Sequence, residues 1–211
     1  MEEPRIYAPH AIEPAYEALK SYLEDSVAAG AEFKVDDTIQ MSWIWLQVSN
    51  DERGKKVTAP VYPSMPMEFS DDCSDALNLM IRQRYVADSF GEEPGWCNAC
   101  QSAIVIKDLY ECEQWFMNRM DPEEASDSGW FVGAEDSNLD VNVAKNLERK
   151  SLWELYCHRE EIGEFFLLPV DWGVDFEAEP VVWHDNEQIT PLPGSYLEAK
   201  TKANNGWQSD A

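Results

Sequence analysis

The chain has 211 residues and a formal net charge of −25, from 41 acidic and 16 basic residues. Direct binding to nucleic acid or to an anionic membrane is disfavoured, because both surfaces attract Lys and Arg, whereas a basic protein partner is favoured. Hydrophobic residues make up 44% of the chain and aromatic residues 12%, which predicts a folded protein with a sizeable core.

The N-terminus does not resemble a secretory signal. Met1 to Arg5 includes two acidic residues where a signal has basic ones, and no apolar run follows. No stretch is apolar over the length needed to cross a bilayer. Five cysteines, an odd number in a chain too long to need a disulfide framework, fit a reducing compartment. The sequence therefore predicts a cytoplasmic protein.

Two helices are expected in the first part of the chain. Apolar residues recur at helical spacing from Tyr16 to Val27, and Gly30 is placed to end that helix. A second apolar face runs from Cys73 to Tyr85, with Asp71 or Asp72 as its N-cap.

A β-hairpin is expected between these helices. Alternation over 38–48 predicts one strand that carries Trp43 and Trp45 on the same face, and 56–62 can pair with it. The two tryptophans could form a ligand platform, but rings in this pattern more often belong to the core.

The best boundary between domains is the segment Ser89–Cys100, which contains two glycines and a proline. We therefore predict an N-terminal α+β module over 1–95, a second domain over 101–190 and a flexible tail over 191–211. The fold class expected is α+β, with two small modules that each have a mainly antiparallel sheet and helices packed on one face.

Short strands dominate the second half. Strands are expected over 102–109 and 114–119, where Trp115 and Met117 oppose Phe116 and Asn118. Asp127-Ser128-Gly129 is typical of a turn, and Trp130 to Val132 follows as a strand whose rings must be buried. Ser151 and Glu154 form a capping-box pattern at a helix start, and 181–184 predicts a last strand.

Cys97-Asn98-Ala99-Cys100 is the one local motif that suggests chemistry. Such a pair suits redox activity or half of a zinc site, for which the further ligands would be Cys112, Cys157 or His158. A redox pair usually opens a helix, whereas here a strand follows, and no second pair has zinc spacing. No nucleophile elbow or phosphate-binding loop is present in the sequence. We expect reduced cysteines, no metal, no cofactor and no enzymatic activity.

Four short motifs in the C-terminal half occur in a recognisable order. They are the Asp127-Ser-Gly-Trp turn, the Gly133-Ala-Glu-Asp turn, Ser151-Leu-x-x-Leu155, and the ending with Leu168, Gly173 and Phe176. In this order they resemble the immunity protein 33 family of small bacterial domains. Trp172 stands where the family has a small residue, and the insert 138–150 is not typical. The resemblance implies an immunity protein that neutralises a toxin, and it supplies no catalytic residues.

A function follows from the resemblance together with the charge. We expect inhibition of a basic cognate toxin by occlusion, through acidic loops of the C-terminal half and a few aromatic anchors. The candidate partner-binding residues are Phe131 and Trp172 as anchors and Glu135, Asp136, Asp171 and Asp175 as the acidic rim. The alternatives are that Trp172 is core and the acids only maintain solubility, that the chain is an acidic adaptor or scaffold for a basic cellular protein, or that it is an enzyme of unknown type.

Overall fold

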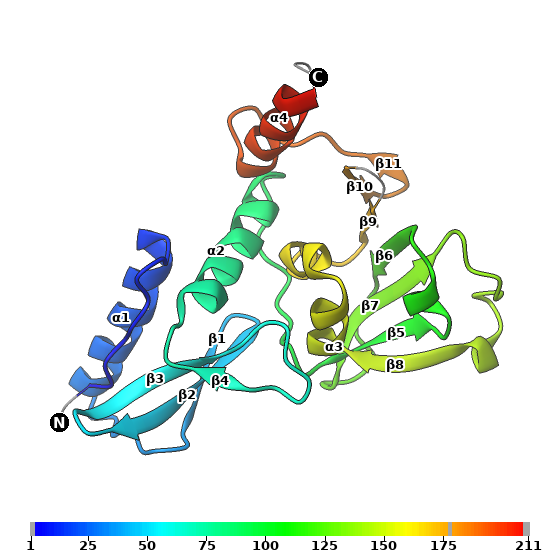
Figure 1. Cartoon of the computed structure of the whole chain (residues 1–211). Coiled ribbons are helices and arrows are strands. Elements are labelled where there is room, and N and C mark those ends of the chain that lie inside the picture. The colour runs from blue at the N-terminus through cyan, green and yellow to red at the C-terminus, as the bar shows by residue number, and fades with distance from the viewer. Residues whose placement is uncertain (1–2, 177–178, 209–211) are drawn as a thin grey trace. The chain divides into compact units, whose positions relative to one another are not determined.

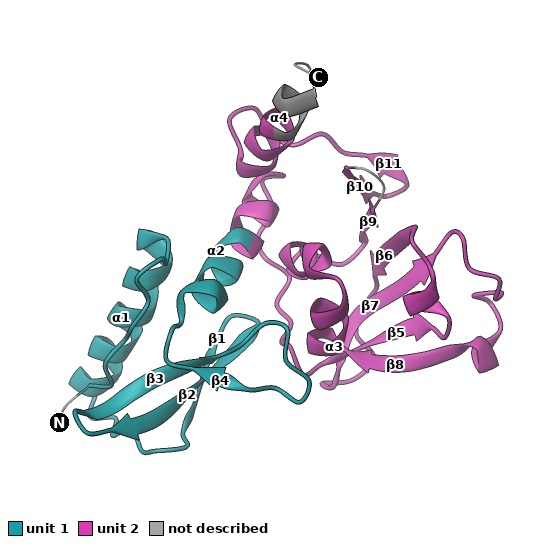
Figure 2. Ribbon diagram, viewed as in Figure 1, with its two compact units in different colours: residues 1–82 teal, residues 83–211 magenta. Residues whose placement is uncertain are grey.

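The structure is a computed structural model that describes residues 3–176 and 179–208. It contains two compact units, residues 1–82 and 83–211 (Figure 2). Each unit combines helices with a β-sheet, which confirms the α+β class. The two units divide inside helix α2 (Ser74–Asp88), whereas the sequence favours Ser89–Cys100, so the domain limits stay a prediction.

Unit 1 has a four-stranded antiparallel sheet in the order β1-β2-β3-β4 (Figure 1). Helix α1 spans Glu13–Ala28, as expected, and Gly30 follows it with a φ of 92°. The buried face of β2 carries Ile44, Leu46 and Val48. The strands are β1 (Thr38–Met41), β2 (Ile44–Asp51), β3 (Gly54–Pro60) and β4 (Phe69–Ser70).

The single strand expected over 38–48 is wrong, because this stretch forms the hairpin of β1 and β2. Met41 pairs with Ile44, and Ser42 between them has a φ of 55°, which turns the chain back. Trp43 is fully buried, as predicted. Trp45 is only half-buried, because it alternates with the core residues of β2 and lies on the opposite face.

Unit 2 has a seven-stranded sheet in the order β11-β10-β9-β6-β7-β5-β8. Only the β5–β7 pair is parallel, so the sheet is mainly antiparallel, as expected. The strands are β5 (Ser102–Ile106), β6 (Trp115–Arg119), β7 (Asp127–Ala134), β8 (Leu147–Ser151), β9 (Trp172–Phe176), β10 (Pro180–His184) and β11 (Glu187–Gln188). The helical segments are η1 (Leu109–Glu111), η2 (Ala144–Asn146), α3 (Leu152–His158), η3 (Glu160–Phe165) and α4 (Tyr196–Gln208).

Helix α3 begins as the capping pattern predicts. The Ser151 side chain accepts a hydrogen bond from the backbone N–H of Glu154 at 3.1 Å. Strand β8 just before it was not foreseen, since the sequence suggests only an insert there. Its residues 147–151 are mostly charged, and such a short polar edge strand has no alternating pattern.

The C-terminal segment differs from the flexible tail expected over 191–211, because most of it forms α4. Leu197 is buried, and its backbone N–H donates to the Ser89 hydroxyl at 3.2 Å. Lys200 lies 2.6 Å from a carboxylate oxygen of Glu164. These contacts hold the first turns of α4 within unit 2. Among the described residues, no helix is both long and apolar enough to span a membrane.

Candidate protein-binding surface

The strand register of unit 2 places two of the predicted site residues on one face of the sheet. Asn118 of β6 pairs with Phe131 of β7 on one side and with Gly173 of β9 on the other. Phe116, two residues earlier, pairs with Gly133 and with Asp175. Residues that are opposite each other, or two apart on one strand, share a face of the sheet. Phe131 and Asp175 therefore lie on the same face, on either side of β6.

The other face of this sheet is the core. Trp130, Val132 and Val174 alternate with the residues above and are fully buried or nearly so. The η3 segment packs on this side, since the ring of Phe165 meets the ring of Phe176 edge-on at 5.5 Å between centroids. Helix α3 and η3 are seen beside the sheet in Figure 1.

The face opposite the core is partly exposed, and we call it the open face. Asn118 is exposed, and the remaining side chains are half-buried. Two aromatic rings, those of Phe116 and Phe131, meet there with their centroids 6.0 Å apart. The open face consists of Ile104, Phe116, Asn118, Phe131, Gly133, Gly173, Asp175, Val181 and Trp183.

Two glycines of the open face leave room for side chains of the neighbouring strand. A Cβ atom at Gly133 would lie 2.5 Å from the ring of Phe116, and one at Gly173 would lie 2.3 Å from the side-chain oxygen of Asn118. Both side chains therefore lie across the neighbouring strand, over backbone that carries no side chain of its own. The Phe116 ring thereby becomes part of a flat apolar centre.

Carboxylates flank this apolar centre. Glu135 follows β7 and Asp171 precedes β9, and both are exposed. Asp175 is half-buried and accepts a hydrogen bond from the indole N–H of Trp183 at 2.7 Å. A shallow polar pocket opens between these strands and is lined by Asn118, Arg119, Asp171, Trp172, Gly173, Asp175, Trp183, Asp185 and Asn186. The open face thus combines apolar rings with negative charge.

Asp136 has a structural role. Its carboxylate accepts hydrogen bonds from the backbone N–H groups of Glu113 at 2.9 Å and Gln114 at 3.1 Å. The first of these bonds is the main reason why the pKa of Asp136 lies below its ordinary value. This carboxylate fastens the start of β6 to the turn after β7, so a substitution there tests the turn as well as any partner contact.

Trp172 needs a correction as a surface anchor, because only 4% of it is exposed. Its side chain packs between Phe90, at 5.0 Å between ring centroids, and His184, at 4.8 Å. It alternates with Gly173 and therefore belongs to the core side of the sheet. The core alternative for this residue, which the sequence left open, is the one the structure supports.

The sequence analysis missed most of the open face. Of its partly exposed side chains, only Phe131 and Asp175 were among the predicted site residues, and Phe116, Asn118 and Trp183 were not. The signal was present in the alternation over 114–119, which separates Phe116 and Asn118 from the buried pair beside them. What was missing was the strand order that places β6 between β7 and β9.

The Asp127-Ser128-Gly129 motif, which the sequence predicts as a turn, forms the first residues of β7 instead. Asp127 accepts hydrogen bonds from the N–H groups of Glu123 and Gly129, both at 3.1 Å. Gly129 has a φ of 78°, and a Cβ atom there would lie 2.1 Å from the carbonyl oxygen of Met120. Only glycine fits this approach, so the motif is structural.

Arg119, the residue before Met120, is buried. Its guanidinium donates to backbone carbonyl oxygens and lies 5.6 Å from the Trp130 ring centroid. Burial lowers the pKa of this guanidinium. The carbonyls belong to Gly95, Trp96, Ser128, Phe166 and Leu168. A buried arginine used in this way leaves no periodic signal in the sequence.

The Cys-x-x-Cys motif does not form a metal centre with other described residues. Cys97 is buried, its thiol donates to the carbonyl oxygen of Phe166 at 3.2 Å, and burial raises its pKa to about 12. Cys100 is exposed. In the part of the chain that the structure describes, no three His, Cys, Asp or Glu side chains are grouped to hold a metal ion.

The comparisons concern the same half of the chain. The model of the Imm33-like domain family matches residues 82–185, which include every strand of the seven-stranded sheet except β11. The resemblance of the C-terminal half to this immunity family is thereby confirmed. No curated protein and no solved structure gave a match.

Proposed function

We propose, from the match of residues 82–185 to the Imm33-like domain, that this chain is an immunity protein that binds and neutralises a cognate protein toxin through the open face. The family match carries the proposal at the level of the toxin-immunity class. The open face is where we propose that the toxin binds, because it is the partly exposed side of the matched sheet.

The composition of the open face suits a protein partner. Binding surfaces commonly combine a central apolar area with a polar rim, and aromatic side chains contribute most of the affinity. Here the rings of Phe116 and Phe131 form the centre. Glu135 and Asp171 are exposed beside it and form part of the polar rim.

The partner we propose is a basic toxin. The net charge of −25 raises the association rate of a positively charged protein, and carboxylates near the contact focus this attraction. Neutralisation then takes place by occlusion, without catalysis by the immunity protein, and the complex forms in the cytoplasm. The sign of the toxin's charge is therefore part of the proposal and can be tested.

Co-expression with a candidate toxin, sought among the products of neighbouring genes, tests this function. Asn118 is exposed at the middle of the open face, so Asn118→Arg introduces a positive charge without removing a core side chain. We expect this variant to lose protection and to bind the toxin at least about tenfold more weakly, because like charges and a bulky side chain oppose docking.

The matched control is Asn138→Arg, which makes the same chemical change at an exposed loop position of the same unit. It is expected to protect as well as the parent protein. Equal protection by the two variants would contradict docking on the open face, and absence of protection by the parent would contradict the immunity function itself.

A further inference from the structure

A pocket of about 540 Å³ lies in unit 1, and all of its lining residues are outside the family match at 82–185. Segments that are distant in the sequence form it, namely residues 3–7, the β2–β3 hairpin and the start of α1. Sites for small organic molecules usually measure about 300–1,000 Å³, so one such molecule fits this volume. The charged side chains of the lining are Glu3, Arg5, Asp51, Arg53, Lys56 and Asp71.

Backbone hydrogen bonds fix the walls of this pocket. The N–H of Arg5 donates to the carbonyl of Lys55 at 3.0 Å, and the N–H of Val57 donates to the carbonyl of Arg5 at 2.9 Å. The N–H of Cys73 donates to the carbonyl of Tyr7, also at 2.9 Å. The stretch before α1 therefore lies beside β3 in the manner of a short parallel strand. Walls that are in place before binding need little ordering when a ligand enters.

The two aspartates of the pocket are already paired with basic side chains. Asp51 accepts a hydrogen bond from the Arg5 guanidinium at 2.5 Å, and this bond is the main reason why the pKa of Asp51 lies below its ordinary value. The ammonium group of Lys56 lies 2.5 Å from a carboxylate oxygen of Asp71. Within the pocket, these pairs largely cancel the negative charge of both aspartates.

Other polar groups of the pocket have no partner in the part of the chain that the structure describes. The Nε of Arg5 is buried without a hydrogen-bond acceptor. The guanidinium of Arg53 is exposed and unpaired, and the hydroxyls of Tyr7 and Tyr16 make no hydrogen bond within the same residues. Glu3 is the lining carboxylate outside these ion pairs. Because free donors outnumber this one free carboxylate, the pocket favours a ligand with anionic oxygen atoms.

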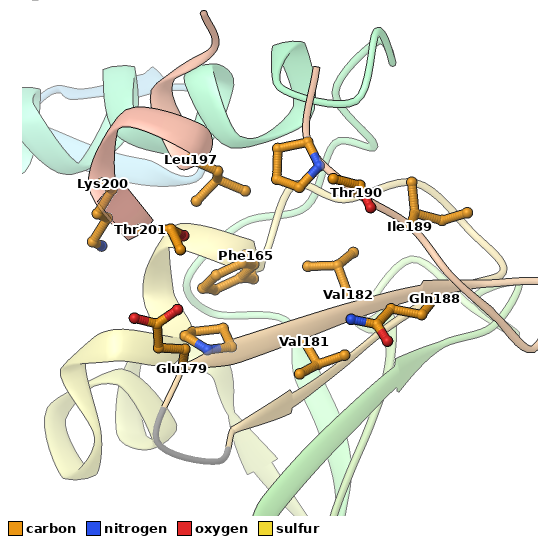
Figure 3. Close-up of a pocket in the computed structure, with 12 residues that line it drawn as sticks. Phe165, Glu179, Val181, Val182, Gln188, Ile189, Thr190, Leu197, Lys200 and Thr201 are labelled. Atoms are coloured by element: carbon orange, nitrogen blue, oxygen red, sulfur yellow. The ribbon is translucent and has the colours of Figure 1, made fainter. Parts of the chain in front are cut away.

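The pocket beside the β10–β11 hairpin of unit 2 differs in this respect (Figure 3). Its volume is about 240 Å³, and its floor is apolar, with Phe165, Val182 and Leu197 pointing into it. Lys200 is the basic residue among its described lining residues, and its ammonium group lies 2.6 Å from a carboxylate oxygen of Glu164. This pocket therefore offers no unpaired cation to select a ligand.

Apolar surface beside the free donors of unit 1 determines the rest of the ligand. Val57 is buried and Ile6 half-buried in the lining, and the side chain of Tyr7 is 60% exposed. Tyrosine presents an apolar ring together with a polar end, so it can contact another ring. A guanidinium such as that of Arg53 binds a carboxylate or a phosphate through two parallel hydrogen bonds. An aromatic ring that carries one of these groups satisfies both requirements.

We propose that this pocket of unit 1 binds a small aromatic anion, with its carboxylate or phosphate group at Arg53 and its ring against Tyr7 and Tyr16. This site goes beyond the immunity function and does not depend on a toxin, because its residues lie outside the matched domain. It gives unit 1 a ligand of its own.

The test uses the whole chain with phenyl phosphate and phenylacetate as probes, at constant ionic strength. The backbone amide signals of Ile6, Arg53 and Val57 are followed by NMR. Both probes are expected to shift these signals with a dissociation constant on the order of 1 mM, as suits a ligand of about ten heavy atoms. Inorganic phosphate lacks the ring and benzyl alcohol lacks the charge, so each is expected to bind at least about tenfold more weakly.

Arg53→Gln is expected to weaken the binding of phenyl phosphate at least about tenfold. The variant keeps the backbone N–H of residue 53, which donates to Asp51 at 2.8 Å, so the hairpin retains this bond. Lys55→Gln is the matched control, because it removes the same charge from the same hairpin at a position that does not line the pocket. It is expected to bind like the parent. Glu3→Gln is expected to bind the probe several-fold more tightly, since it removes the unpaired carboxylate.

A second variant tests the aromatic part of the site. Tyr7→Ala is expected to weaken phenyl phosphate several-fold while leaving the weak binding of inorganic phosphate unchanged. Tyr22→Ala is its control, since this ring is 43% exposed on α1 and does not line the pocket. Equal binding of inorganic phosphate and phenyl phosphate by the parent would overturn the aromatic ligand.

The remaining outcomes separate this site from the function proposed above. Amide signals that ignore both aromatic anions at ten times the expected dissociation constant would overturn the site, whatever the chain does with a toxin. Equal weakening by Arg53→Gln and Lys55→Gln would also overturn it, because only the overall charge would then matter. A chain that binds phenyl phosphate but protects against no toxin would keep this site and lose the immunity function.

Discussion

Arg119→Met is expected to be among the most destabilising single substitutions in unit 2. The guanidinium is buried and supplies hydrogen-bond donors to five backbone carbonyl groups. Methionine fills much of the same volume but leaves those oxygens without this donor. The Phe166 carbonyl keeps the donors of Cys97 and Trp130. Each buried carbonyl that is left without a partner costs about 1–3 kcal/mol, so we expect a loss of at least about 3 kcal/mol in the free energy of unfolding.

Urea unfolding compares this variant with Arg84→Met. Arg84 makes an exposed ion pair with Asp88 at 3.7 Å on α2, and its replacement is expected to change stability by less than about 0.5 kcal/mol. If both variants unfold at the same urea concentration, Arg119 does not hold the segments around it together. A lower midpoint for Arg119→Met alone supports the buried network.

Trp130→Ala is expected to cost about 3–5 kcal/mol, a large part of the stability of a domain. The ring is 1% exposed, and its indole N–H donates to the carbonyl of Phe166 at 3.0 Å. Alanine leaves both a cavity and an acceptor without this donor. The free energy of unfolding from denaturant titration measures the loss.

Trp96→Ala provides the control for this tryptophan. Its side chain is 64% exposed, so its truncation is expected to leave the unfolding midpoint nearly unchanged. If Trp130→Ala has the same free energy of unfolding as the parent, this result would contradict the burial of the ring in the core of the seven-stranded sheet.

Local patterns in the sequence predicted individual elements of unit 2 well. Alternation identified β6, and a β-branched run identified β5. The Ser151 cap was predicted because its hydrogen bond joins residues three positions apart. Such features depend on neighbours along the chain, which a sequence displays directly.

Features that depend on strand order could not be predicted in this way. Phe131 and Asp175 share a face only because β6 pairs with both of their strands. Trp172 is apolar and adjacent to acids, and only the register shows that it points to the core. Arg119 satisfies carbonyl groups from segments that are distant in the sequence, so no spacing rule identifies it.

The structure also changes which acids can test the proposed docking. Asp136 and Asp175 make hydrogen bonds within the fold, so their neutralisation perturbs structure as well as charge. Glu135 and Asp171 are exposed beside the open face. Asp171 has a φ of 70°, a conformation that asparagine tolerates, so Asp171→Asn preserves the local backbone.

The most direct test of docking on the open face is the association rate of a toxin identified by the co-expression test, measured as a function of ionic strength. The parent is compared with the double variant Glu135→Gln, Asp171→Asn. The control, Glu93→Gln with Glu160→Gln, removes the same charge from exposed positions elsewhere in unit 2. We predict that the parent rate falls steeply with salt, that the first double variant associates several-fold more slowly at low salt, and that the control stays close to the parent. A parent rate that does not change with salt, or equal slowing by the two double variants, would contradict binding of a basic toxin at this face.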